Sequence, residues 1–135
     1  MKLAIFGSRT LSDNRIDDII QNKINELLPE QIITSGETSG VNEIARNKAK
    51  ENKITLVLEY ANNQKYATGK YHMRCIEILK KADFVLFIHD GNSKGTKNEL
   101  EQCKKMGKPF KYLQVDVNEE EDNMGFVFNE VQWNT

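Results

Sequence analysis

The sequence has few features of secreted, membrane or zinc-binding proteins. Its two cysteines, Cys75 and Cys103, show no CxxC spacing and are too few for a disulfide scaffold or a structural zinc site. The apolar run at residues 3–6 is too short for a signal peptide and far shorter than a membrane span of roughly 20 residues. We therefore expect buried, reduced thiols, a cytoplasmic location and no membrane partner.

Motifs that identify several enzyme classes are also absent. Neither the dinucleotide-binding pattern GxGxxG nor the Walker pattern GxxxxGK[ST] occurs, which argues against an ordinary dehydrogenase and against a P-loop NTPase. No GxSxG elbow is present for a serine nucleophile. His72 and His89 have no third convergent ligand in the sequence pattern, so we predict no metal site and no cofactor.

Length and composition predict a single globular domain. The chain has 135 residues, of which 39% are hydrophobic and 29% charged, and these values exclude a disordered or collagen-like protein. The net charge of -1 conceals an asymmetry, because residues 116–135 hold six of the 20 acids and none of the 19 Lys and Arg residues. The rest of the chain therefore carries 19 - 14 = +5, which suits a phosphorylated ligand. The basic residues are scattered without interleaved aromatics, so a nucleic-acid partner is not expected.

Apolar runs alternate with stretches of helical spacing along most of the chain. Short apolar runs predict strands at residues 2–6, 31–34, 54–58, 82–89 and 110–115. Apolar residues at helical spacing between these runs predict four helices. This alternation predicts an α/β domain over residues 1–115, with a Rossmann-like, doubly wound, mainly parallel sheet of about five strands and helices on both faces.

Residues 116–135 form an acidic tail that ends in apolar residues. Four acids lie at residues 119–122, and large apolar side chains follow at Phe126, Val127, Phe128, Val131 and Trp133. Such a segment can dock on its own domain or on a second subunit, and the sequence leaves both interpretations open.

Three loops rich in Gly, Ser and Thr follow predicted strands, at residues 7–9, 35–40 and 90–96. In open parallel sheets ligands bind beyond the carboxyl ends of the strands, where backbone amides and helix dipoles favour anions. The loops therefore predict a phosphate site, although such residues also simply make turns. The candidate ligand-binding residues are Gly7, Ser8, Arg9, Ser35, Gly36, Ser39, Gly40, Gly91, Ser93, Gly95 and Thr96.

Two further charged residues are candidates for catalysis. Arg74 follows a long polar loop and can reach a phosphate or carboxylate as a bidentate donor, or lie in solvent on its helix. Glu99 can act as an acid, a base or a stabiliser of positive charge on a sugar carbon. Because Thr96 and Glu99 also fit a capping box, a purely structural role for Glu99 stays open. Tyr60, Tyr66 and Tyr71 flank the long polar loop and can stack on a base or pack within the domain.

The order of these segments resembles the SLOG superfamily. The resemblance is carried by Phe6-Gly7-Ser8-Arg9, residues 35–42, Met73-Arg74, and residues 91–96 with Glu99, and it covers residues 2 to about 115. It is nearest to the small YspA/YpsA-related members and more distant from the Lonely Guy phosphoribohydrolases and DprA. The resemblance implies a Rossmann-like domain that binds nucleotides or nucleotide-derived ligands such as nucleoside monophosphates and ADP-ribose derivatives.

The resemblance also implies roles for single residues. Arg74 matches the arginine of the Lonely Guy motif MHxRK, and Gly95, Thr96 and Glu99 match the GTxxE part of PGGxGTxxE. Cys75 replaces the lysine of the first motif, and residues 90–95 have a longer glycine spacing than the second. We therefore expect a protein that senses or sequesters a nucleotide-derived ligand, with phosphoribohydrolase activity as the alternative. Relatives commonly form homodimers, so a homo-oligomer is a further expectation.

Overall fold

The computed structural model describes residues 1–11, 14–61, 69–91, 94–118 and 125–133. Strands and helices alternate from the start of the chain to the fifth strand, as the sequence predicts, and a sixth strand follows. The elements in chain order are β1 (Lys2–Gly7), α1 (Asn14–Leu27), β2 (Gln31–Ser35), α2 (Gly40–Glu51), β3 (Thr55–Glu59), α3 (Lys70–Lys81), β4 (Phe84–His89), α4 (Lys94–Lys105), β5 (Phe110–Asn118) and β6 (Gly125–Trp133).

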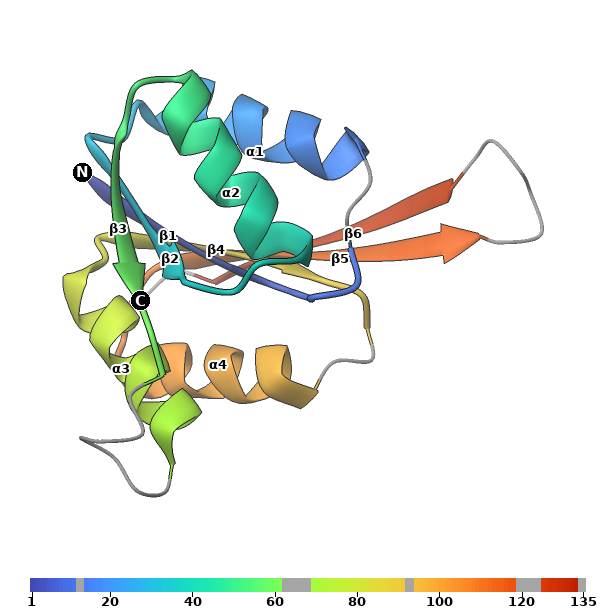
Figure 1. The fold of residues 1–135 in the computed structure, drawn as a ribbon. Helices are drawn as coiled ribbons and strands as arrows, with labels where there is room; N and C mark the ends of the chain where they lie inside the picture. Colours follow the sequence, from blue (N-terminus) through green and yellow to red (C-terminus); the bar gives the residue numbers. More distant parts are fainter. Residues whose placement is uncertain (12–13, 62–68, 92–93, 119–124, 134–135) are drawn as a thin grey trace.

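The sheet has the strand order β3-β2-β1-β4-β5-β6. The first five strands are parallel, and β6 pairs antiparallel with β5. The helices lie on both faces, α1 and α2 on one and α3 and α4 on the other (Figure 1). The chain moves outward from β1 to β3 and then returns to place β4 on the other side of β1, so the strand order reverses between β1 and β4. Such a switch point is where open parallel sheets bind ligands.

The alternation of side chains in the central strands builds a hydrophobic core on each face. In β1, Leu3 and Ile5 join the core that α1 and α2 cover, whereas Ala4 and Phe6 join the core under α3 and α4. Because both faces are covered, the central strands are apolar throughout and appear in the sequence as continuous apolar runs. The α/β fold class predicted from the sequence is confirmed by this sheet.

The last part of the chain differs from the sequence-based expectation. β5 continues to Asn118, past the predicted end at residue 115, and β6 adds an edge strand in the segment that the sequence indicated only as an apolar docking element. Nine residue pairs, from Phe110 with Trp133 to Asn118 with Gly125, join the two strands. The hairpin projects beyond the helices that cover the rest of the sheet (Figure 1).

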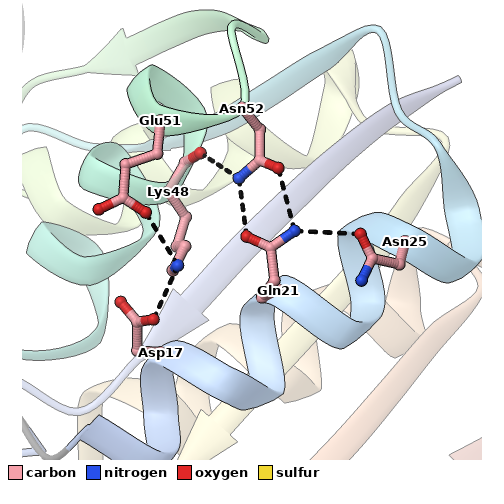
Figure 2. Close-up of polar contacts among 6 residues, drawn as sticks. All are labelled: Asp17, Gln21, Asn25, Lys48, Glu51 and Asn52. Carbon is pink, nitrogen blue, oxygen red and sulfur yellow. Dashed lines mark hydrogen bonds and ion pairs between the residues drawn. The ribbon is translucent and has the colours of Figure 1, made fainter.

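Helices α1 and α2 are joined by a network of polar side chains (Figure 2). Lys48 of α2 lies between two carboxylates, with its Nζ 2.7 Å from Asp17 Oδ2 and 2.9 Å from Glu51 Oε2. These acceptors raise the pKa of Lys48 above its usual value. The side-chain amides of Gln21 and Asn52 form two reciprocal hydrogen bonds of 3.0 and 2.9 Å. The network fixes α1 against α2 on the face of the sheet opposite α3 and α4.

Both cysteines are buried free thiols. Burial is the main cause that raises the pKa of each thiol to about 12, so both stay protonated at neutral pH. In the ranges that the structure describes, His, Cys, Asp and Glu side chains form no group of three that could hold a metal ion. Nor does any helix within these ranges have the length and apolar character needed to cross a membrane.

Candidate functional site

A cavity of about 750 Å³ lies at the switch point of the sheet. It is bordered by the loops that follow β1, β2 and β4 and by side chains of α3 and α4. Its walls therefore come from segments far apart in the sequence. The lining residues are Gly7, Ser8, Arg9, Thr10, Glu37, Asn42, Tyr71, His72, Arg74, Cys75, Asp90, Gly95, Thr96, Asn98, Glu99, Glu101, Gln102 and Lys105.

Two glycines allow the turn after β1 to lie directly against the start of α2. A Cβ on Gly7 would lie 2.4 Å from the Cβ of Val41, and a Cβ on Gly40 would lie 2.4 Å from the carbonyl oxygen of Ser8. Gly40 also has a φ of +68°, in the left-handed region that side chains other than glycine rarely adopt. The Val41 amide donates a 3.2 Å hydrogen bond to the Ser8 carbonyl oxygen. The close approach fixes one wall of the cavity.

Hydrogen bonds between the loops after β1 and β4 form the floor of the cavity. The Ser8 amide donates to the Ile88 carbonyl oxygen at 3.1 Å, and the Asp90 amide donates to Ser8 Oγ at 3.1 Å. Thr10 Oγ1 donates to Asp90 Oδ2 at 3.1 Å. Ser8 is therefore a buried structural link between the two loops as well as a lining residue.

Two arginines from different elements meet inside the cavity. Arg9 Nη2 lies 2.9 Å and Arg74 Nη1 3.1 Å from the same atom, Oε1 of Glu37. The Arg74 side chain is 11% exposed and that of Glu37 16%, whereas Arg9 is 60% exposed. The guanidinium carbons of Arg9 and Arg74 lie 6.0 and 5.2 Å from the centre of the Tyr71 ring. The cavity therefore holds a pair of cations supported by an aromatic face.

Glu99 of α4 faces the same cavity and is partly buried. Loss of hydration raises the pKa of its carboxyl group to about 8, Arg74 and Arg9 oppose this shift, and the negative charge of Glu37 adds to it. At neutral pH Glu99 is therefore mainly a neutral acid that can donate a hydrogen bond or a proton. Because α4 begins at Lys94, Thr96 lies within the helix and is not its N-cap, so the capping-box interpretation of Glu99 is wrong.

The raised pKa of Glu99 predicts a pH-dependent stability. Its folded-state pKa of about 8 exceeds the ordinary value of 4.5, so the folded protein holds a proton that the unfolded chain releases between these values. The contribution of Glu99 to the unfolding free energy should therefore be largest below about pH 4.5 and fall by about 3 kcal/mol between pH 5 and pH 8, because the unfolded chain releases a proton that the folded protein retains. Urea unfolding of the wild type and Glu99→Gln at both pH values measures this. An equal pH dependence in the two proteins would contradict it.

The cavity brings together some of the residues singled out from the sequence but not all of them. Those in its lining are Gly7, Ser8, Arg9, Arg74, Gly95, Thr96 and Glu99. Ser35, Gly36, Ser39, Gly40 and Gly91 are outside the lining, and Ser93 lies outside the described residues. Gly36 instead packs under the ring of Tyr60, which a Cβ on Gly36 would approach to 2.0 Å.

Sequence reasoning missed Glu37, the residue at the centre of the arginine pair. The sequence placed Glu37 inside the predicted loop at residues 35–40, but a carboxylate repels phosphate and so gave no reason to include it in a phosphate site. Asn42 also lines the cavity. The buried hydroxyl of Thr34 lies 3.0 Å from Asn42 Oδ1 and 2.9 Å from the Ile5 carbonyl oxygen, and both oxygens can accept its hydrogen bond. Glu37 could have been found only by knowing which loops meet, whereas Asn42 ends the segment 35–42 that carries the sequence resemblance.

Comparisons with known proteins identify the fold. No protein-family model matches the sequence, and no curated protein matches it. The structure is similar to the Moco Carrier Protein from Chlamydomonas reinhardtii, with a TM-score of 0.58 and 16% sequence identity over 81% of this chain and 73% of that chain. At this identity the likeness defines the class of protein, an α/β protein with a Rossmann-like fold.

Proposed function

We propose that this protein binds a nucleotide-derived small molecule in the cavity at the switch point, as a sensor or sequestering protein of the SLOG type. The observation that carries the proposal is the convergence of Arg9 and Arg74 inside a cavity of about 750 Å³ that also includes Gly95 and Thr96 in the first turn of α4. Arginine pairs and helix N-termini both favour phosphate groups.

Several features suit a nucleoside monophosphate or an ADP-ribose-like ligand. The volume is within the range of small-molecule sites. Tyr71 provides an aromatic face, and Asn42, Asn98 and Gln102 provide amides that can pair with the polar edge of a base. The structural neighbour is named as a carrier of a small molecule, Moco, which is compatible with a binding function. The cytoplasmic location and the homodimer stay predictions.

A phosphoribohydrolase is the second candidate, and the position of Glu99 favours it. A neutral carboxyl group in the same cavity as Arg74 can protonate a departing base while the arginine binds the sugar phosphate. Ionisation of Glu99 above about pH 8 would end this role, so turnover should decrease at alkaline pH.

One experiment separates the binder from the enzyme. The purified protein is incubated with AMP, ADP-ribose and NAD, passed through an ultrafilter, and the nucleotides and free bases in both fractions are quantified by chromatography. We expect intact ligand to be retained at up to one equivalent per chain. Free base beyond the amount of protein, lost in Glu99→Gln, would instead establish the enzyme. No retention and no free base would contradict both functions for these ligands.

A further inference from the structure

The carboxylate of Glu37 occupies the place in the cavity where an anionic ligand would meet the arginines. Both guanidinium groups direct a nitrogen to the single atom Oε1, at 2.9 and 3.1 Å. Glu37 itself lines the cavity, so its side chain lies in the space open to a ligand. Phosphate oxygens accept charge-assisted hydrogen bonds from arginine as carboxylate oxygens do.

We infer that Glu37 is an internal competitor for the anion site, and that the phosphate of a ligand binds by displacing the Glu37 carboxylate from Arg9 and Arg74. The inference rests on the proposed function, since it concerns how the same site receives its ligand. It predicts that the native chain binds phosphate less tightly than it could, because Glu37 offsets part of the arginine charge when no ligand is bound.

The charges around the arginines support a competing role. Glu37 offsets one of the two positive charges of the arginine pair. A phosphate that entered without moving Glu37 would place its charge beside an existing carboxylate, which is costly in a partly buried site. Displacement removes that repulsion and frees donors of both guanidinium groups for the ligand.

The backbone geometry limits the movement to the Glu37 side chain. The Gly36 amide donates a 2.9 Å hydrogen bond to the Glu59 carbonyl oxygen, and the ring of Tyr60 packs on Gly36. The Glu37 amide lies 3.4 Å from Ser35 Oγ. The guanidinium groups also lie near the Tyr71 ring, 6.0 and 5.2 Å from its centre, and this interaction does not involve Glu37. Rotation of one side chain is therefore enough to open the site.

The opposite role predicts the opposite result. If Glu37 served to orient the arginines for the ligand, its removal would loosen both guanidinium groups and weaken binding. If it competes, its removal strengthens binding. The sign of one affinity change therefore distinguishes a competitor from a positioning residue.

The test is calorimetric titration of inorganic phosphate and of AMP into the wild type and Glu37→Gln, with Glu37→Ala as a second variant. Since hydrogen bonds to charged groups contribute about 1.5–3 kcal/mol, loss of the competing contacts should tighten phosphate binding about tenfold or more. Glu101→Gln is the matched control, because Glu101 also lines the cavity but pairs at 3.9 Å with Lys104. It should change affinity at most about threefold.

Unchanged or weaker phosphate binding in both Glu37 variants would overturn the inference, as would an equal gain in Glu101→Gln. Thermal unfolding of each variant verifies that it is folded. Stronger phosphate binding without any binding of AMP, ADP-ribose or NAD would support the role of Glu37 and contradict the proposed nucleotide function. If the wild type bound AMP and the Glu37 variants bound it no more tightly, the proposed nucleotide function would be supported and the role of Glu37 contradicted.

Discussion

Replacement of Gly40 by alanine is expected to destabilise the protein by about 3–5 kcal/mol and to abolish ligand binding. The residue combines a φ of +68° with a backbone contact, since a Cβ would lie 2.4 Å from the Ser8 carbonyl oxygen and 2.5 Å from the carbonyl carbon of Arg9. Backbone atoms cannot rotate away as a flexible side chain can. The turn after β1 must therefore shift, and it carries Arg9 with it. Urea unfolding and AMP titration measure the two effects.

Gly107 is the matched control for this substitution. It has a similar φ of +67°, but a Cβ there would meet nothing within 4 Å. Gly107→Ala should therefore cost only the strain of the left-handed conformation, about 1 kcal/mol, and leave AMP binding unchanged. Equal destabilisation by the two substitutions would show that the contact with the Ser8 turn contributes nothing.

Replacement of Arg74 by glutamine is expected to weaken the binding of AMP or inorganic phosphate about a hundredfold. Its side chain is 11% exposed, so its charge is poorly screened by water. Glutamine preserves much of the length of the side chain but removes the positive charge and the planar guanidinium group, which can donate two parallel hydrogen bonds. Calorimetric titration at a fixed salt concentration gives the change in affinity.

Two other arginines provide the controls for this prediction. Arg9 contacts the same Glu37 oxygen but is 60% exposed, and Arg9→Gln should weaken binding about tenfold or less. Arg46 lies in α2, away from the lining of the cavity, and Arg46→Gln should leave affinity unchanged. If Arg46→Gln weakened binding as much as Arg74→Gln, general charge rather than the cavity would account for the affinity.

Most of the fold could be predicted because the central strands are covered on both faces. A strand such as β4 is apolar from Phe84 to Ile88, which gives a clear signal in the sequence. β6 gave no such signal. Its apolar residues are compatible with a strand, but they follow an acidic run and do not alternate strictly with polar residues. From the sequence, a strand paired with β5 could therefore not be distinguished from an irregular tail docked on the domain.

The site was predictable in its location but not in its contacts. The rule that ligands bind at the carboxyl ends of strands identified the loops after β1 and β4. It gave no reason to expect Arg9 and Arg74 to meet Glu37, which lies 37 residues from Arg74 along the chain. The start of α4 at Lys94 was also missed, because Gly91 and Gly95 both indicated a loop up to Thr96.

The contact between the loops after β1 and β4 also limits when the cavity can form. Ser8 and Asp90 are 82 residues apart, and Thr10 and Asp90 are 80 apart. Pairing of β1 with β4 therefore closes a very long loop, which carries a cost in chain entropy and favours slow folding. During synthesis the cavity cannot form until α4 has left the ribosome, because residues of α4 line it. A small molecule that binds in the cavity therefore cannot stabilise a shorter nascent chain.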